Sequence, residues 1–279
     1  MTELAESSGD TGFPVPGWLI EHARRFYASG EAPVPPRVAA TVALLRPAPG
    51  SGFEVYVLRR AATMAFASGM YAFPGGSVDP RDADASIAWL GPSPAEWGVR
   101  LGLPPAKAQA VVCAAVREVF EEAGVLHAAV GATDGADWER ARQGLISREL
   151  SLSEVFAERD LALRSDLLVP WARWVTPEFE PRRFDTYFFL AVLPDGQDAR
   201  DVSGEADHTM WVRPAEALAR LAAGRIAMLP PTIVVLRELA AYPDIAGALA
   251  AAAGRDAATP VMPRLDGDRL VIDPAPDLP

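Results

Sequence analysis

The sequence predicts an α/β fold in which helices cover both faces of a mixed β-sheet. Residues 38–45 and 53–58 are apolar runs of strand length separated by a turn, which predicts a hairpin. Residues 169–176 and 184–193 predict further strands far along the chain. Because helical segments separate the two groups, we expect strands that pair both locally and at long range. The fold class that follows is an α/β/α sandwich on a mixed sheet.

The longest predicted helix spans about 106–123. Pro104 and Pro105 open this helix, and Gly124 ends it as a residue free to adopt a positive φ. Ser93 and Glu96 form a capping box that predicts a shorter helix just before it. The same signals predict helices at 18–27, at 137–145, after Ser151, and at 214–223, 231–240 and 244–252.

The chain divides into a tail and helix at 1–30, a main domain at 31–255 and a tail at 256–279. Two segments of the main domain, about 80–104 and 131–167, lie outside the regular alternation of strands and helices. We interpret them as insertions packed on the domain, because neither is long enough to form a large core of its own.

The composition restricts the partners of the protein. The 279 residues are 50% hydrophobic and carry a net charge of −11, which argues against nucleic acid or an anionic membrane as the main partner. The single cysteine, Cys113, excludes an intrachain disulfide. No apolar run approaches the length of a membrane span, and the first residues lack the pattern of a signal peptide, so we expect a cytoplasmic protein.

Three glutamates share one face of the longest helix. Glu118, Glu121 and Glu122 are spaced i, i+3 and i+4, which places their side chains within one sector of the helix. Like charges at this spacing repel, so the cluster is either a solvated face or a site for a cation. A set of oxygen ligands favours Mg²⁺ or Mn²⁺ over zinc.

The segment from Arg117 to Val125, Arg-Glu-Val-Phe-Glu-Glu-Ala-Gly-Val, resembles the second half of the Nudix hydrolase signature. That signature reads Gly-x5-Glu-x7-Arg-Glu-U-x-Glu-Glu-x-Gly-U, where U is aliphatic. Gly76, in Phe-Pro-Gly-Gly, matches the opening glycine, but Arg117 follows it by 41 residues instead of 14. The first glutamate of the signature therefore falls on Asp82 when counted from the glycine, or on Gln109 when counted back from Arg117.

The resemblance implies a metal-dependent hydrolase with a Nudix-type fold and helical insertions. By position, Glu118, Glu121 and Glu122 hold Mg²⁺ or Mn²⁺ with help from the Gly76 carbonyl. Arg117 is expected to orient Glu118 by an ion pair, and both take part in catalysis.

Further roles are assigned around this centre. Glu205, in a late loop, is the candidate general base, with an ordinary loop carboxylate as the alternative. Arg60, Arg182 and Arg183 are candidate phosphate ligands, and Gly75 allows close approach of a substrate.

The insertion points to a substrate class. Together with Phe-Pro-Gly-Gly-x-x-Asp and the Arg182–Thr186 segment Arg-Arg-Phe-Asp-Thr, it resembles the branch that includes peroxisomal coenzyme A and acyl-CoA diphosphatases. A coenzyme A motif of a sister branch fits only in part, because Ala65 replaces its second arginine. The expected substrate is coenzyme A or acyl-CoA, cleaved to 3′,5′-ADP and an (acyl-)phosphopantetheine.

Two other functions remain open at this point. An ADP-ribose, NADH or nucleotide-sugar diphosphatase would carry the same signature, and a Nudix-fold protein that binds a metabolite without catalysis would keep the fold. A small-molecule partner is expected in each case, and a homodimer is possible because many Nudix enzymes are dimers.

Overall fold

An eight-stranded mixed sheet forms the centre of the protein. The computed structural model describes residues 12–61, 67–128, 131–202, 204 and 206–272. The strand order is β10-β3-β2-β9-β8-β11, with β4 beside β3 and β5 beside β2. The strands are β2 (Arg37–Pro47), β3 (Phe53–Arg60), β4 (Tyr71–Ala72), β5 (Gly75–Ser77), β8 (Leu168–Val175), β9 (Phe184–Val192), β10 (Ala206–Val212) and β11 (Pro260–Val261).

The pairing pattern confirms the mixed sheet. The predicted hairpin is present, since β2 and β3 pair antiparallel, and the two late strands β8 and β9 also pair antiparallel. The two groups meet where residues 37–45 of β2 pair in parallel with the whole of β9. The central strand β2 therefore contacts both groups, and its neighbour β5 carries the two glycines of Phe-Pro-Gly-Gly.

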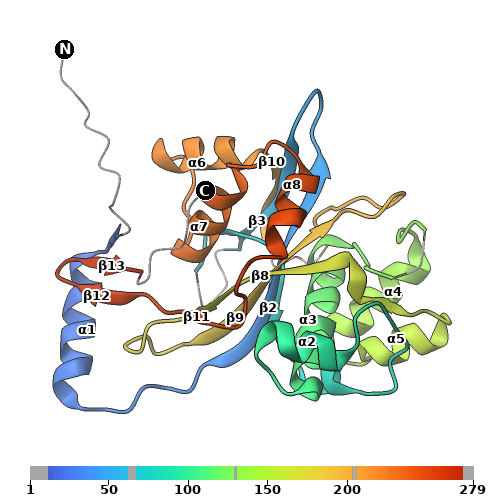
Figure 1. The fold of residues 1–279 in the computed structure, drawn as a ribbon, viewed down its shortest axis with the longest axis horizontal. Coiled ribbons are helices and arrows are strands. Elements are labelled where there is room, and N and C mark those ends of the chain that lie inside the picture. Colours follow the sequence, from blue (N-terminus) through green and yellow to red (C-terminus); the bar gives the residue numbers. More distant parts are fainter. Residues whose placement is uncertain (1–11, 62–66, 129–130, 203, 205, 273–279) are drawn as a thin grey trace.

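Helices cover both faces of the sheet, which confirms the sandwich (Figure 1). On one face α3 packs with its neighbours into a core that includes Val112, Val116 and Phe120. On the other face a second core includes Trp171, Leu236 and Leu239. The first group of helices is α2 (Pro94–Leu101), α3 (Pro105–Ala123), α4 (Ala136–Ile146) and α5 (Leu152–Glu158), and the second is α6 (Pro214–Ala222), α7 (Pro230–Leu239) and α8 (Ile245–Ala252).

The two predicted insertions are tied to each other. β6 (Trp89–Leu90) pairs in parallel with β7 (Leu163–Arg164), and the short 3₁₀ turns η1 (Pro80–Ala83) and η2 (Ser165–Leu167) flank these strands. Phe156 of α5 is buried in the same core as α3. These contacts join the two segments to each other and to α3, and the division of the chain into a domain with two insertions stays a prediction.

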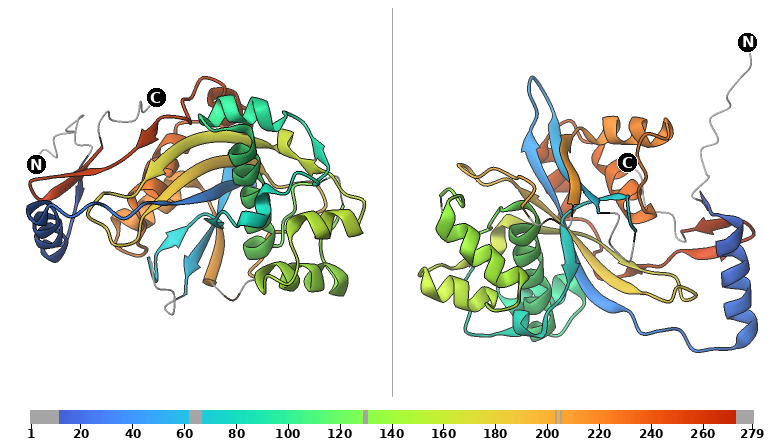
Figure 2. Two further views of the ribbon diagram at one scale, coloured as in Figure 1. Left: turned by 90° about the horizontal axis from the view of Figure 1, so that it is seen from below. Right: turned by 180° about the vertical axis from the view of Figure 1, so that it is seen from behind.

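Residues near the two ends of the described chain meet in a small three-stranded sheet. β1 (Phe13–Pro14) pairs with β13 (Arg269–Val271), which pairs with β12 (Arg264–Asp266), and α1 (Gly17–Ser29) packs beside them. We call α1, β1, β12 and β13 the terminal module. It stands at the opposite side of the molecule from α3, α4 and α5 (Figures 1 and 2). Among the described residues, none of the helices combines the length and apolarity that crossing a membrane requires.

His127, directly after α3, makes the stability of the fold depend on pH. Its side chain is fully buried, and burial lowers its pKa to about 4 against a smaller opposing effect of the Val192 backbone. In the unfolded chain the imidazole of His127 has the ordinary histidine pKa of 6.5. Stability from this group is complete above pH 6.5 and is lost as the pH falls toward 4, by on the order of 3 kcal/mol.

Replacement of His127 by Leu should remove this component, because a leucine cannot bind a proton. The free energy of unfolding, measured by urea denaturation at several pH values between 7.5 and 4, should fall less steeply in His127→Leu than in the wild type. Parallel pH profiles for the two proteins would contradict the assignment.

Candidate active site

The two glycines of β5 lie against β2 on one side and α3 on the other. Gly75 pairs with Thr41 and Gly76 with Ala40. A Cβ atom on Gly75 would overlap the backbone of β2, whereas one on Gly76 would lie 2.6 Å from the carboxyl group of Glu118. Both positions therefore require glycine, and for different reasons.

All three glutamates of α3 have partners within the protein. The Gly75 backbone N–H donates to Glu122 Oε2 at 2.8 Å. Arg117 Nη1 donates to Glu118 Oε1 at 2.7 Å and to Glu121 Oε1 at 3.1 Å. Glu118 and Glu122 are buried, so the alternative of a solvated acidic face is wrong. The cover comes from η1 and β5, which pack on this side of α3.

Arg117 forms a two-pronged ion pair with Asp82. Its Nε donates to Asp82 Oδ1 at 3.0 Å and its Nη2 to Oδ2 at 2.9 Å, and both side chains are buried. The same Nη2 reaches the carbonyl of Ser77 at 2.9 Å. A guanidinium held in this fork geometry is fixed in orientation. Arg117 thereby holds the carboxyl group of Glu118 in place, and the part of both residues in catalysis stays a prediction.

Asp82 also settles which residue replaces the first glutamate of the signature. Gln109, the other candidate, donates instead to the backbone carbonyl of Asp84 at 2.8 Å. Asp82 stands in η1, six residues after Gly76, and accepts from the Asp79 N–H at 2.8 Å. The extra residues therefore loop out after Asp82, and the two halves of the signature meet in space.

The electrostatics of this cluster favour a cation. Burial raises the pKa of Glu118 to about 7, with a further contribution from Glu121, while Arg117 opposes the shift. The guanidinium of Arg117 contacts three carboxylates, those of Asp82, Glu118 and Glu121, and the carboxylate of Glu122 lies beside them on α3. An additional positive charge would offset this excess.

The donor set fits a hard divalent ion, because all the side-chain ligands in the cluster are carboxylate oxygens. In the described residues no three acidic, histidine or cysteine side chains are already arranged as a metal site. At the cluster, Arg117 Nη1 lies within hydrogen-bond distance of both Glu118 and Glu121. Glu118, Glu121 and Glu122 would hold the ion. The choice between Mg²⁺ and Mn²⁺, and the role of the Gly76 carbonyl, stay predictions.

A cavity of about 1030 Å³ adjoins the cluster. It begins at Arg117 and the three glutamates, passes Gly75 and Gly76, and continues over the sheet toward α1 and β13. The lining of the cavity also includes Leu145, Ile146 and Arg148, which belong to the second insertion. A cavity of this size can enclose a ligand much larger than a diphosphate.

The predicted phosphate ligands have different positions. Arg60 lines the cavity. Arg183 is buried, donates to the carbonyls of Thr176 and Val34, and is not among the described residues that line the cavity. Arg182 is exposed and is not among the described residues that line the cavity. Glu205, the candidate base, lies outside the described residues.

Three arginines that the sequence did not single out also line the cavity. Arg81 is one of them and forms an ion pair with Asp79, and the other two are Arg37 and Arg148. Arg37 opens β2, and Arg148 follows α4 with a φ of 61°. Within the described part of the chain, neither guanidinium has a hydrogen bond or ion pair. No local motif marks either residue, because only the fold brings them to the same cavity as the glutamates.

Comparison with known proteins identifies the family. A family model described as the NUDT19 Nudix domain matches residues 98–239, half of the chain. The chain belongs to the Nudix hydrolase family. The crystal structure of a NUDIX hydrolase from Alicyclobacillus acidocaldarius is 31% identical, with a TM-score of 0.65 over 78% of this chain and 96% of that one.

Curated Nudix relatives cover much of the chain. Putative nudix hydrolase 7 of Caenorhabditis elegans is 29% identical over 68% of this chain and 57% of that protein. Acyl-coenzyme A diphosphatase NUDT19 of Homo sapiens is 29% identical over 72% of this chain and 64% of that protein. The Nudix chain described here thus spans about three fifths of the length of these relatives.

The two glycines give a matched pair of substitutions. In Gly76→Ala the new methyl group meets the end of the Glu118 side chain, which must move, so Mn²⁺ affinity should fall at least about tenfold with little loss of stability. In Gly75→Ala it meets the backbone of β2, so the free energy of unfolding should fall by roughly 1–3 kcal/mol. Electron paramagnetic resonance titration of Mn²⁺ and urea denaturation measure the two effects. Equal stability losses without a change in Mn²⁺ binding would contradict the assignment.

Proposed function

We propose that this Nudix protein is a metal-dependent hydrolase that cleaves the diphosphate linkage of coenzyme A or acyl-CoA. The products would be 3′,5′-ADP and a phosphopantetheine, free or acylated. The observation that carries this proposal is the reassembled signature, Asp82 with Arg117 and the three glutamates, at one end of a cavity large enough for such a substrate. The name of the human relative, an acyl-coenzyme A diphosphatase, supports the substrate class.

The charges in the cavity support an anionic substrate. The chain carries a net charge of −11, so a diphosphate needs local cations to approach. Arg37, Arg60 and Arg148 line the cavity and supply guanidinium groups, which suit phosphate oxygens. These three replace the set Arg60, Arg182 and Arg183 as our assignment of the substrate-binding arginines.

In the reaction a water oxygen bonds to one phosphorus, the P–O bond to the bridging oxygen breaks, and the released proton passes to a base. A bound Mg²⁺ or Mn²⁺ would neutralise charge on the phosphates and lower the pKa of the water. Arg117, held by Asp82, keeps the carboxylate of Glu118 in place, and the Gly75 N–H does the same for Glu122. Glu205 stays our candidate for the base, and a cytoplasmic location and a homodimer stay predictions.

A panel assay tests this function. Coenzyme A, acetyl-CoA, dodecanoyl-CoA, ADP-ribose and NADH are incubated with the protein and Mg²⁺ or Mn²⁺, and the products are identified by mass. We expect 3′,5′-ADP from coenzyme A or its esters. AMP from ADP-ribose or NADH as the main product would instead identify a nucleotide-sugar diphosphatase, and no product from any of them would favour a metabolite-binding protein.

Glutamine substitutions connect the activity to the glutamates. Glu121→Gln and Glu122→Gln should each lower turnover at least about a hundredfold, because a carboxylate ligand is lost while the fold is kept. Glu158→Gln on α5, an exposed glutamate paired with Arg159, is the matched control and should keep the wild-type rate. Wild-type rates in the first two variants would refute the metal assignment.

A further inference from the structure

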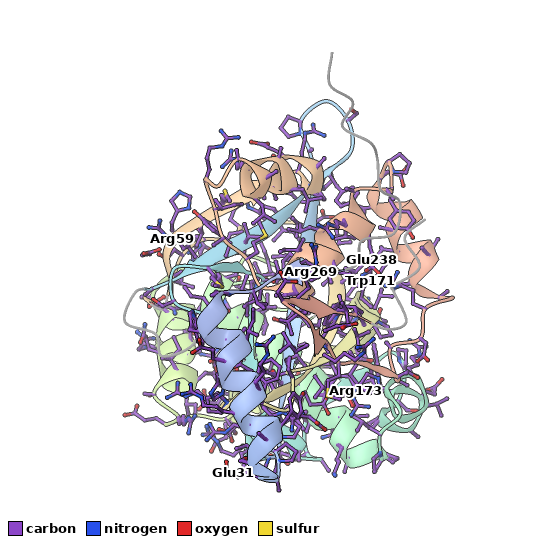
Figure 3. All side chains as sticks on the ribbon, turned by 90° about the vertical axis from the view of Figure 1, so that its left-hand side faces the viewer. Glu31, Arg59, Trp171, Arg173, Glu238 and Arg269 are labelled. Carbon is purple, nitrogen blue, oxygen red and sulfur yellow. The ribbon has the colours of Figure 1, made fainter. Side chains whose placement is uncertain are left out.

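The cavity has two chemically different ends. The charged end holds the glutamates of α3 and the glycines of β5. At the far end the cavity is lined by Leu19 of α1 and Leu270 of β13 from the terminal module, and by Pro263 just before β12. Figure 3 views this side of the molecule, with α1 in front and Arg269 of β13 near its upper end. A hydrolytic site for a diphosphate alone needs no such extension.

Large apolar side chains line the floor between the two ends, together with Arg37 and Thr186. Phe184 and Phe188 of β9 line the cavity with Trp174 of β8. Phe184, Thr186 and Phe188 alternate along β9, so they present one face of the strand to the cavity. Phe184 is partly exposed, and Phe188 and Trp174 are 7% and 3% exposed. The parts of these aromatic side chains that line the cavity are surfaces that an apolar ligand can cover.

The strand register shows in which direction the far end of the cavity lies from the glycines of β5. Ala40 of β2 pairs with Gly76, and Arg37, three residues earlier, pairs with Phe184. Three residues of an extended strand span about 10 Å. Phe184 therefore lies about that far from the glycine turn along β2, in the direction of the chain's connection to α1.

A small buried apolar cluster stabilises the terminal module. Leu19, Ala23, Phe179 and Leu270 form a buried cluster of their own. Leu19 and Leu270 are each 8% exposed, so both take part in this cluster and in the cavity wall. The two ends of the described chain thus build one side of the cavity together.

We propose that the terminal module, with the aromatic floor of β8 and β9, forms a subsite for the fatty acyl chain of an acyl-CoA substrate. This inference rests on the proposed function and narrows it, because ADP-ribose and NADH have no acyl chain. With the diphosphate at the glutamates, the pantetheine arm follows β2 and β9 toward Phe184, and the acyl chain contacts Leu19 and Leu270. Each methylene group buried there raises affinity by up to about fourfold.

The test compares coenzyme A, octanoyl-CoA and dodecanoyl-CoA as substrates. In the wild type, kcat/KM should rise with acyl length. Leu19→Ala and Leu270→Ala should each lower the dodecanoyl-CoA to coenzyme A ratio of kcat/KM about threefold or more. Leu265→Ala is the matched control, because Leu265 packs on the same cluster and pairs with Leu270 but does not line the cavity. It should keep the wild-type ratio and activity.

The results distinguish failure of the acyl subsite from failure of the proposed function. An unchanged ratio in Leu19→Ala and Leu270→Ala overturns the subsite, as does an equal fall with coenzyme A and its esters in all three variants. If the wild type hydrolyses neither coenzyme A nor its esters, the proposed function fails, and calorimetric titration with dodecanoate decides on the subsite alone. Dodecanoate binding that weakens in Leu19→Ala and not in Leu265→Ala supports the subsite, and no binding to the wild type overturns it.

Discussion

The buried ion pair between Asp82 and Arg117 is the contact on which the site depends. It joins the turn that follows β5 to α3, two segments that the chain separates by an inserted loop and helix. The same guanidinium reaches Glu118, Glu121 and the Ser77 carbonyl. Arg117 thus fixes Glu118 and Glu121 relative to the glycine turn, and the Gly75 N–H holds Glu122. Because both partners are buried, either one alone would leave an uncompensated charge.

The helices could be predicted closely, because their ends carry local signals. The capping boxes at Ser93 and Ser151 and the glycine at 124 act over three or four residues, so the sequence alone determines where those helices begin or end. The strands β2, β3, β8 and β9 could likewise be predicted from their apolar runs. The short strands β5 and β11 could not, because each exists only through pairing with a longer neighbour.

The site could be predicted only where it follows one helix. The register of α3 fixes Arg117 and the glutamates, whereas the choice between Asp82 and Gln109 depends on where the inserted residues leave the chain. The burial of the acidic face was not predictable either, since η1 and β5 cover it from elsewhere in the chain. Arg37 and Arg148 belong to no motif, so the sequence did not indicate them as cavity residues. Arg183 belongs to a motif, but its guanidinium donates to backbone carbonyls.

The most direct test is a double-mutant cycle on the ion pair. Asp82→Asn, Arg117→Gln and the double variant are compared with the wild type in free energy of unfolding, measured by urea denaturation. If the pair holds the two halves of the signature together, the coupling energy should be about 2 kcal/mol or more. The same cycle with Gln109→Ala in place of Asp82→Asn should give a coupling near zero. Additive effects of Asp82→Asn and Arg117→Gln, within about 0.5 kcal/mol, would contradict the account.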